Sequence, residues 1–257
     1  SFHEVPYDDL EKPTINFSMP YLRFVSIAAK IKDEVARKNI LAPYESSLIP
    51  LPHQILVLEK VMNSNQNRFM LADEVGMGKT IETGLILKEL KIRGDIKRIL
   101  TIVPKSAMLQ WQSELKEHFN EVFHLYDSGM ITSMARTFAN INADEEYNFW
   151  TQHNQIIVST DALKPLEKRQ GWSKERVDEY NKYRMQAVLV ADFDLVIIDE
   201  AHKMGGATSI VSRYIFAQEI CNSVPNVMLL TATPHRGKAD HFRRILQLLD
   251  PDAFAGE

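Results

Sequence analysis

Residues 72–80 combine glycines, a lysine and a threonine in an order suited to holding phosphate groups. The segment reads ADEVGMGKT, and it lies between a short strand-like run and a helix-like run. Backbone N–H groups of such a turn point inward, and the N-terminus of the following helix adds positive potential. Gly76 and Gly78 allow the backbone to curl tightly. Lys79 is expected to reach the β- and γ-phosphates of a nucleotide, and Thr80 to offer its hydroxyl to Mg²⁺.

The loop departs from the common phosphate-loop pattern G-x-x-x-x-G-K-[ST], because Asp73 occupies the first glycine position. The form A-x-x-x-G-x-G-K-T is a variant found in helicase-like motors. We therefore expect the whole loop to surround the nucleotide, through residues Asp73, Glu74, Val75, Gly76, Met77, Gly78, Lys79 and Thr80.

Two adjacent carboxylates follow an apolar run at residues 195–198. A buried parallel strand presents its C-terminal end at the ligand edge of the sheet, so Asp199 and Glu200 should lie there. Asp199 is predicted to hold Mg²⁺, through water, and Glu200 to orient and deprotonate the attacking water. His202, two residues later, is predicted to relay between this pair and a segment that contacts nucleic acid.

A second apolar run ends in Thr231, and residues 229–237 read LLTATPHRG. Thr231 and Thr233 can sense a γ-phosphate through their hydroxyls, and Arg236 is placed with them in a coupling role. Upstream, Gln54 opens a helix shortly before the phosphate loop. An amide can donate to and accept from the adenine edge at once, so Gln54 is predicted to select ATP.

Strand-like and helix-like runs alternate along the chain. Strands are expected at 68–72, 98–103, 122–126, 155–159, 195–199 and 226–230, with helices at 78–91, 108–119 and 239–249. Apolar, two-sided strands separated by helices predict a three-layer α/β fold with a central, mostly parallel sheet. Apolar residues at helical spacing add an N-terminal helical extension over 20–38.

The expected domains are a lead-in with a helix at 1–47 and one large lobe at 48–257. Residues 163–190 break the regular alternation with seven Lys/Arg against four Asp/Glu, and they are predicted to form a charged helical insertion. Two interpretations of this segment remain: a solvated surface helix, and a contact for nucleic acid or a partner. The net charge of −4 means that any nucleic-acid contact must come from a local patch.

The motifs, in the order in which they follow one another along the chain, resemble the first RecA-like lobe of helicase superfamily two. This lobe is a RecA-like three-layer P-loop domain. Residues 73–84, with 109–111 and 233–237, are similar to the Swi/Snf-type group, particularly its bacterial and archaeal members such as the RNA-polymerase-associated ATPase. The resemblance covers residues 48–254. It implies an ATP hydrolase that depends on double-stranded DNA and uses ATP and Mg²⁺. It also implies that Pro104 and Lys105, with Ser159 and Thr160, face nucleic-acid phosphates.

The family's active site lies between two RecA-like lobes, and the second lobe supplies an arginine finger. No second lobe is found in the chain, so a second lobe is an expected partner and the chain alone is expected to be nearly inactive. Two alternatives remain: an RNA helicase lobe, and a nucleotide-binding interaction module without motor activity. The single cysteine and the lack of a leader or long apolar run predict a cytoplasmic protein that does not enter a membrane.

Overall fold

The computed structural model describes five residues near the N-terminus (19, 22, 23, 26 and 27) and residues 39–64, 66–72, 76, 78–133, 148–204, 211–232 and 239–254. The chain divides into two compact units, residues 1–39 and 40–257. The second unit carries the fold described below. Most of the predicted helix at 20–38 lies outside the described residues.

A six-stranded parallel sheet forms the middle layer of the second unit. Its strands are β1 (Arg68–Leu71), β2 (Ile99–Val103), β3 (His124–Tyr126), β4 (Gln155–Ser159), β5 (Leu195–Ile198) and β6 (Asn226–Leu230). They lie in the order β1-β6-β5-β2-β4-β3, and every pairing among them is parallel. Every residue of β2 and β5 is buried, as expected for strands covered on both faces.

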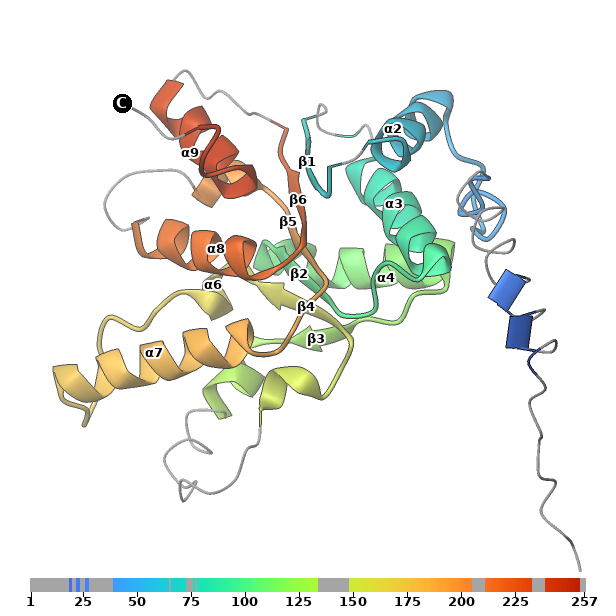
Figure 1. Cartoon of the computed structure of the whole chain (residues 1–257). Helices are drawn as coiled ribbons and strands as arrows, with labels where there is room; N and C mark the ends of the chain where they lie inside the picture. The colour runs from blue at the N-terminus through green and yellow to red at the C-terminus, as the bar shows by residue number, and fades with distance from the viewer. Residues whose placement is uncertain are drawn as a thin grey trace, which may run out of the picture. The chain divides into compact units, whose positions relative to one another are not determined.

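Helices cover the two faces of the sheet (Figure 1). One face carries α2 (Pro52–Met62), α3 (Lys79–Arg93) and α4 (Met108–Phe119). The other carries α6 (Thr160–Leu163), α7 (Lys174–Leu189), α8 (Val211–Ser223) and α9 (Ala239–Leu249). The predicted three-layer α/β architecture with a parallel sheet is therefore confirmed.

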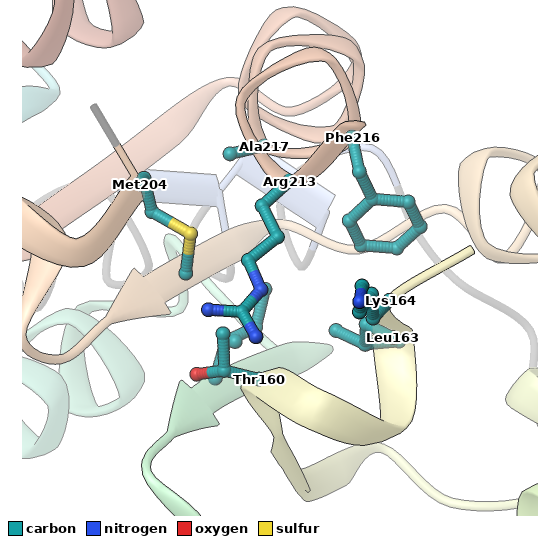
Figure 2. A pocket seen from close by; sticks show the side chains of 8 residues that line it. Thr160, Leu163, Lys164, Met204, Arg213, Phe216 and Ala217 are labelled. Carbon is teal, nitrogen blue, oxygen red and sulfur yellow. The ribbon is translucent and has the colours of Figure 1, made fainter. Parts of the chain in front are cut away.

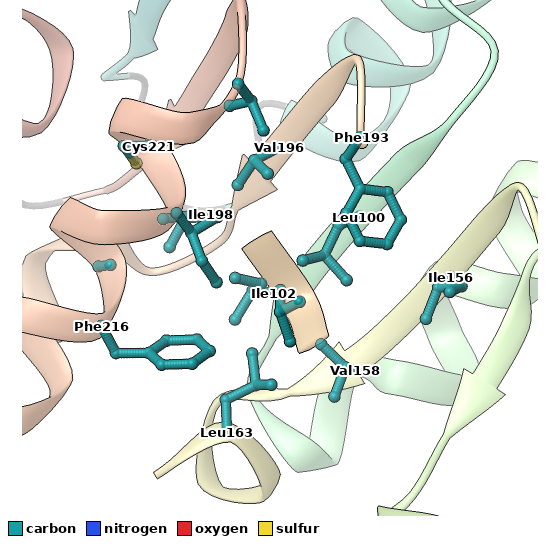
Figure 3. Close-up of a cluster of buried hydrophobic side chains, with 14 of the residues drawn as sticks. Leu100, Ile102, Ile156, Val158, Leu163, Phe193, Val196, Ile198, Phe216 and Cys221 are labelled. Atoms are coloured by element: carbon teal, nitrogen blue, oxygen red, sulfur yellow. The ribbon is translucent and has the colours of Figure 1, made fainter. Parts of the chain in front are cut away.

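Each face of the sheet has its own hydrophobic core, because successive side chains of a strand point to opposite sides. On β2, Leu100 and Ile102 pack into the core beneath α8 (Figure 3), whereas Ile99 and Val103 pack into the core beneath α3 and α4. The predicted helix at 108–119 corresponds to α4, and its buried face consists of Met108, Trp111, Leu115 and Phe119.

The charged insertion is helical only in its second part. The helix α7 begins at Lys174, after a Ser173 side chain that accepts a hydrogen bond from the Arg176 N–H. The preceding residues form turns instead, because Pro165 disfavours a helical residue before it and Gly171 adopts a left-handed φ of 78°. Within the predicted insertion at 163–190, the helix α7 therefore occupies Lys174–Leu189.

The strand order brings three predicted motifs to one edge of the sheet. β6 lies between β1 and β5, and all three run in the same direction. The residues that follow their C-terminal ends are therefore neighbours, although they are far apart in sequence. The Thr231 N–H donates to the Leu71 carbonyl at 3.0 Å, which ties the end of β6 to the strand before the phosphate loop.

Candidate active site

The described part of the phosphate loop has the conformation that its glycines predict. Gly76 and Gly78 have φ angles of 89° and 85°, in the left-handed region that side chains disfavour. Gly78 caps α3, and its carbonyl accepts the N–H groups of Ile81 and Glu82. Lys79 and Thr80 thus form the first turn of α3, where the backbone N–H groups of a helix N-terminus and the helix dipole favour an anion.

Six residues of the predicted site lie outside the described part of the chain. Four belong to the phosphate loop and two to the segment after β6. They are Asp73, Glu74, Val75, Met77, Thr233 and Arg236.

Gln54 lies against the phosphate loop. Its side chain is 4% exposed, and its Oε1 accepts the Leu51 N–H at 2.9 Å, which closes the first turn of α2. A Cβ atom added to Gly78 would stand only 2.6 Å from the Gln54 Nε2. The amide of Gln54 therefore occupies the space beside the loop, and only glycine fits opposite it.

Asp199 is held in place by two hydrogen bonds. Its Oδ2 accepts the indole N–H of Trp111 at 3.1 Å, and its Oδ1 accepts the Glu200 N–H at 2.7 Å. Burial raises the pKa of the Asp199 carboxyl above its ordinary value, and the nearby charge of Glu200 acts in the same direction. Both hydrogen bonds and the positive charge of Lys79 favour the ionised form and oppose that rise. The electrostatic interaction places Lys79 and Asp199 in one site.

Glu200 has an unusual backbone conformation. Its φ is 51°, in the left-handed region, which costs a residue with a Cβ about 1–2 kcal/mol. The Glu200 side chain is 33% exposed, and Asp199 is partly buried. The two adjacent carboxylates differ in their partners: Asp199 accepts hydrogen bonds from Trp111 and Glu200, whereas the Glu200 side chain contacts His202.

His202 links the acidic pair to β6. Its Nδ1 lies 3.0 Å from the Glu200 Oε2 and 3.1 Å from the Thr231 Oγ1. His202 is 4% exposed and Thr231 is fully buried. Since the Thr231 backbone also bonds to Leu71, a chain of short contacts joins Glu200 to the strand before the phosphate loop.

A separate open groove, of about 700 Å³, lies at the same edge of the sheet. It is lined by Pro104, Lys105, Ser106, Thr160, Asp161, Lys203 and Arg213. The two segments predicted to face nucleic acid meet here, because the Thr160 hydroxyl donates to the Val103 carbonyl at 3.3 Å. Arg213 extends from α8 toward Thr160 (Figure 2) and pairs with Asp161 at 3.1 Å.

Ser159 departs from this arrangement. It is 1% exposed and does not line the groove. Its hydroxyl accepts the Ala162 N–H at 3.1 Å, which caps the short helix α6. The side chain of Ser159 therefore holds Thr160 and Asp161 in place, and no face of it is available to a ligand in this structure.

Three residues at these sites had no predicted role in binding. Trp111 belonged only to the segment 109–111 of the family resemblance, because nothing in its spacing indicates that its indole N–H reaches Asp199. Lys203 follows His202 directly in the sequence, and this position next to a predicted site residue is the signal that could have identified Lys203. Arg213 lies in a helix that the sequence reading did not identify, so its contribution to the groove depends wholly on tertiary packing.

The profile of the SNF2-related domain matches residues 53–256, which is most of the chain. The chain belongs to the SNF2-related domain family. The RNA polymerase-associated protein RapA of Actinobacillus succinogenes is 36% identical over 255 aligned residues, which cover 93% of this chain and 24% of that protein. The SNF2-related chain thus spans about a quarter of that relative.

Two solved structures are similar to this SNF2-related chain in fold. The Sulfolobus solfataricus SWI2/SNF2 ATPase core in complex with dsDNA matches with a TM-score of 0.60 and 20% identity, over 83% of this chain and 38% of that one. The Pyrococcus furiosus Hef helicase domain matches with a TM-score of 0.52 and 17% identity, over 78% of this chain and 36% of that one. No helix among the described residues has the length and apolar character needed to cross a membrane.

Proposed function

We propose that this chain is the ATP-binding first lobe of an ATPase that moves on double-stranded DNA. The observation that carries the proposal is the meeting of Lys79, Asp199 and the Glu200–His202–Thr231 contacts at one edge of the sheet. Membership of the SNF2-related domain family supports the same function. Because the chain spans only part of its relatives, the activity belongs to the longer protein.

The nucleotide would lie across the N-terminus of α3. Residues 73–80 would surround the phosphates with backbone N–H groups, and Lys79 would neutralise the charge of the β- and γ-phosphates. The Gln54 Oε1 already accepts one hydrogen bond, but a carbonyl oxygen has two lone pairs. Its amide can therefore still recognise the adenine edge while it caps α2.

The residues present fit a magnesium ion that arrives with the nucleotide. No group of three or more His, Cys, Asp or Glu that could hold a metal is found in the described parts of the chain. Mg²⁺ commonly needs only one or two protein ligands, since phosphates and waters supply the rest. The Thr80 hydroxyl and the Asp199 carboxylate would hold it, and the bound ion would neutralise charge on the reacting phosphates.

Glu200 would orient the attacking water and accept its proton. Its side chain is 33% exposed at the ligand edge, and its backbone has a left-handed φ of 51°. His202 would keep the Glu200 carboxylate in position through the 3.0 Å contact with its Nδ1. Thr231, with Thr233 and Arg236 after it, would couple the state of the γ-phosphate to the rest of the motor.

Duplex DNA would lie in the groove lined by Pro104, Lys105 and Thr160, with Lys203 adding positive charge. Hydroxyls, lysines and backbone N–H groups are the usual partners of DNA phosphates and read no sequence. A second RecA-like lobe would close the site and supply an arginine finger, a contribution of about 10³–10⁵ in rate. The chain alone should therefore bind ATP weakly and hydrolyse it very slowly.

The type of nucleic acid that stimulates the ATPase is tested in the two-lobed protein that contains this chain. ATP turnover would be measured alone and with duplex DNA, single-stranded DNA or RNA. The proposal predicts the largest stimulation by duplex DNA. The strongest stimulation by RNA would favour an RNA helicase lobe, and no stimulation by any nucleic acid would favour an interaction module without motor activity.

A further inference from the structure

A second cavity, of about 310 Å³, lies beside the groove and is formed mainly by the charged insertion. Four of its lining residues are basic: Lys164, Lys168, Arg169 and Arg184. Asp161 lines both the groove and this cavity, so the two are neighbours on the surface. We call this cavity, with its four basic residues, the basic cleft.

The walls of the basic cleft are fixed by contacts from α7. Arg184 is buried and donates to the carbonyls of Ala162 and Lys164. The Asn181 amide both accepts the Leu166 N–H and donates to the Leu166 carbonyl, at 2.8 Å each. These bonds hold the turns that follow α6 against α7. The basic side chains therefore project from a supported surface.

Arg169 is oriented by an aromatic ring. Its guanidinium lies over the Trp172 ring at 4.4 Å, and the Arg176 guanidinium also approaches that ring, at 4.9 Å. The Trp172 ring in turn packs edge-on against Tyr180. A guanidinium stacked on a ring keeps its N–H groups directed outward in its own plane, where they can donate to phosphate oxygens.

The charge of the segment also favours an anionic ligand. Residues 163–190 hold seven Lys/Arg and four Asp/Glu, a net +3, in a chain of net −4. One of the four basic residues of the cleft, Lys164, forms an ion pair with Glu167, and the Lys164 Nζ lies 3.0 Å from the Glu167 Oε1. The side chain of Glu167 is 76% exposed. Such an exposed pair contributes little and is easily exchanged for another anion.

We propose that the basic cleft binds the phosphate backbone of the same DNA that occupies the groove, and so lengthens the footprint of the motor. The inference rests on the proposed function, because it extends the DNA path beyond the motif residues. Lys168 and Arg169 are its direct phosphate contacts. Arg184 is a positioning residue, since its N–H groups are engaged by backbone carbonyls.

The test is equilibrium binding of the two-lobed protein that contains this chain to a labelled duplex of about 20 base pairs, about 68 Å long, at salt concentrations from about 50 to 200 mM. The double variant Lys168→Ala/Arg169→Ala should weaken binding by about tenfold. The plot of log K against log salt has a negative slope, and the variant should make it shallower by about 2, which is about 0.9 for each lost phosphate contact. The charge reversal Lys168→Glu/Arg169→Glu should weaken it further. Unchanged affinity and slope in both variants would overturn the inference.

The matched control is Lys174→Ala/Lys182→Ala, which removes the same charge from exposed positions of α7 that do not line the cleft. It should leave the affinity within about twofold. An equal loss in this control would mean that general charge, and not the cleft, is responsible, which would overturn the inference. Unchanged melting temperatures show that the variants remain folded.

Two further arms separate the possible failures. If Lys105→Ala abolishes DNA binding and the cleft variants do not weaken it, the proposed function stands and the inference about the cleft is wrong. If the unaltered two-lobed protein binds no duplex at any salt concentration, the proposed function itself fails. ATP binding should be the same in the cleft variants, and a loss there would assign the cleft to nucleotide instead of DNA.

Discussion

The Nδ1 atom of His202 lies 3.1 Å from the Oγ1 atom of Thr231, which joins the end of β5 to the end of β6 across 29 residues of sequence. The same nitrogen contacts the Glu200 carboxylate at 3.0 Å. The proposed water-orienting residue is thus connected through one imidazole to the strand that leads into Thr233 and Arg236. A change at either end can therefore reach the other through two short contacts.

Removing the Thr231 hydroxyl should uncouple Glu200 from the end of β6, because it removes the contact between His202 and Thr231. In the two-lobed protein, Thr231→Val should leave ATP affinity within about twofold, because the Thr231 hydroxyl is buried and contacts His202. DNA-stimulated turnover should fall about tenfold, the effect of losing one interaction worth about 1.4 kcal/mol at the rate-determining step.

The matched control for Thr231 is Thr101→Val. Thr101 is equally buried on β2, and its hydroxyl has no hydrogen-bond partner among the residues that the structure describes. This control should leave both stimulation and stability intact or improved, since it removes a buried polar group that is not paired. Equal losses in the two variants would show that the His202–Thr231 contact has no special role.

Glu89 should be important for stability. It is fully buried on α3, its Oε2 accepts the N–H groups of Leu41 and Ala42 at 2.8 Å each, and its Oε1 pairs with Arg93 at 2.9 Å. Glu89→Ala should lower the free energy of unfolding by about 3–5 kcal/mol, because it leaves a nearly buried cation and two N–H groups without their partner. Urea denaturation measures the loss, and Glu117→Ala on the exposed face of α4 should change it by less than about 0.5 kcal/mol.

Gly84 allows α3 and α4 to pack closely. A Cβ at this position would stand 2.2 Å from a ring carbon of Phe119. Helix propensity alone would make Gly84→Ala stabilising by about 1 kcal/mol, whereas the contact predicts a loss of about 1–3 kcal/mol. A double-mutant cycle with Phe119→Leu should recover part of that loss. A stabilising Gly84→Ala would contradict the packing at this contact.

Stability should depend on pH through a histidine pair at the edge strand. The ring centroids of His124 and His153 are 3.5 Å apart. Partial burial lowers the pKa of His153 from its ordinary 6.5, and the neighbouring His124 lowers it further. The unfolded chain then binds more protons than the folded chain near pH 6, so stability should decrease as the pH falls below about 6.5.

The measurement for this pair is the urea midpoint at several pH values. His153→Gln should flatten the decrease, because it removes the group whose protonation the folded state resists. His153 also contacts the Tyr126 hydroxyl, which lies 3.0 Å from its Nδ1. If His153→Gln shows the same pH dependence as the unaltered chain, that dependence arises from other groups.

Much of the fold could be predicted because each buried strand is a short apolar run between turn signals. The predicted bounds of the strands 155–159 and 226–230 and of the helix 239–249 agree with β4, β6 and α9. The helix α8 was missed, since its sequence VSRYIFAQEICNS has apolar residues spread around the helix and shows no single apolar stripe. The strand order came only from the structure, because apolar parallel strands carry few signals for their partners.

The candidate site was predictable where function depends on residue type within one segment. Lys79, Asp199 and Glu200 lie at one edge of the sheet because each follows a parallel strand, and their predicted roles came from the chemistry of their residue types, with which the family resemblance agrees. The indole of Trp111 on Asp199 and the left-handed φ of Glu200 were not predictable, since both depend on tertiary contacts. Ser159 likewise has the residue type of a phosphate ligand, but the helix after it takes its hydroxyl.

The central claim is that Glu200 orients the water for hydrolysis of ATP in a DNA-stimulated motor. The most direct measurement compares the turnover of Glu200→Gln with that of the unaltered two-lobed protein, at saturating ATP and duplex DNA. The substitution keeps the size and the hydrogen-bonding capacity of the side chain but removes the base. Turnover should fall by about 10²–10⁴-fold with ATP binding retained. Turnover within about twofold of the unaltered protein would contradict the assignment of Glu200.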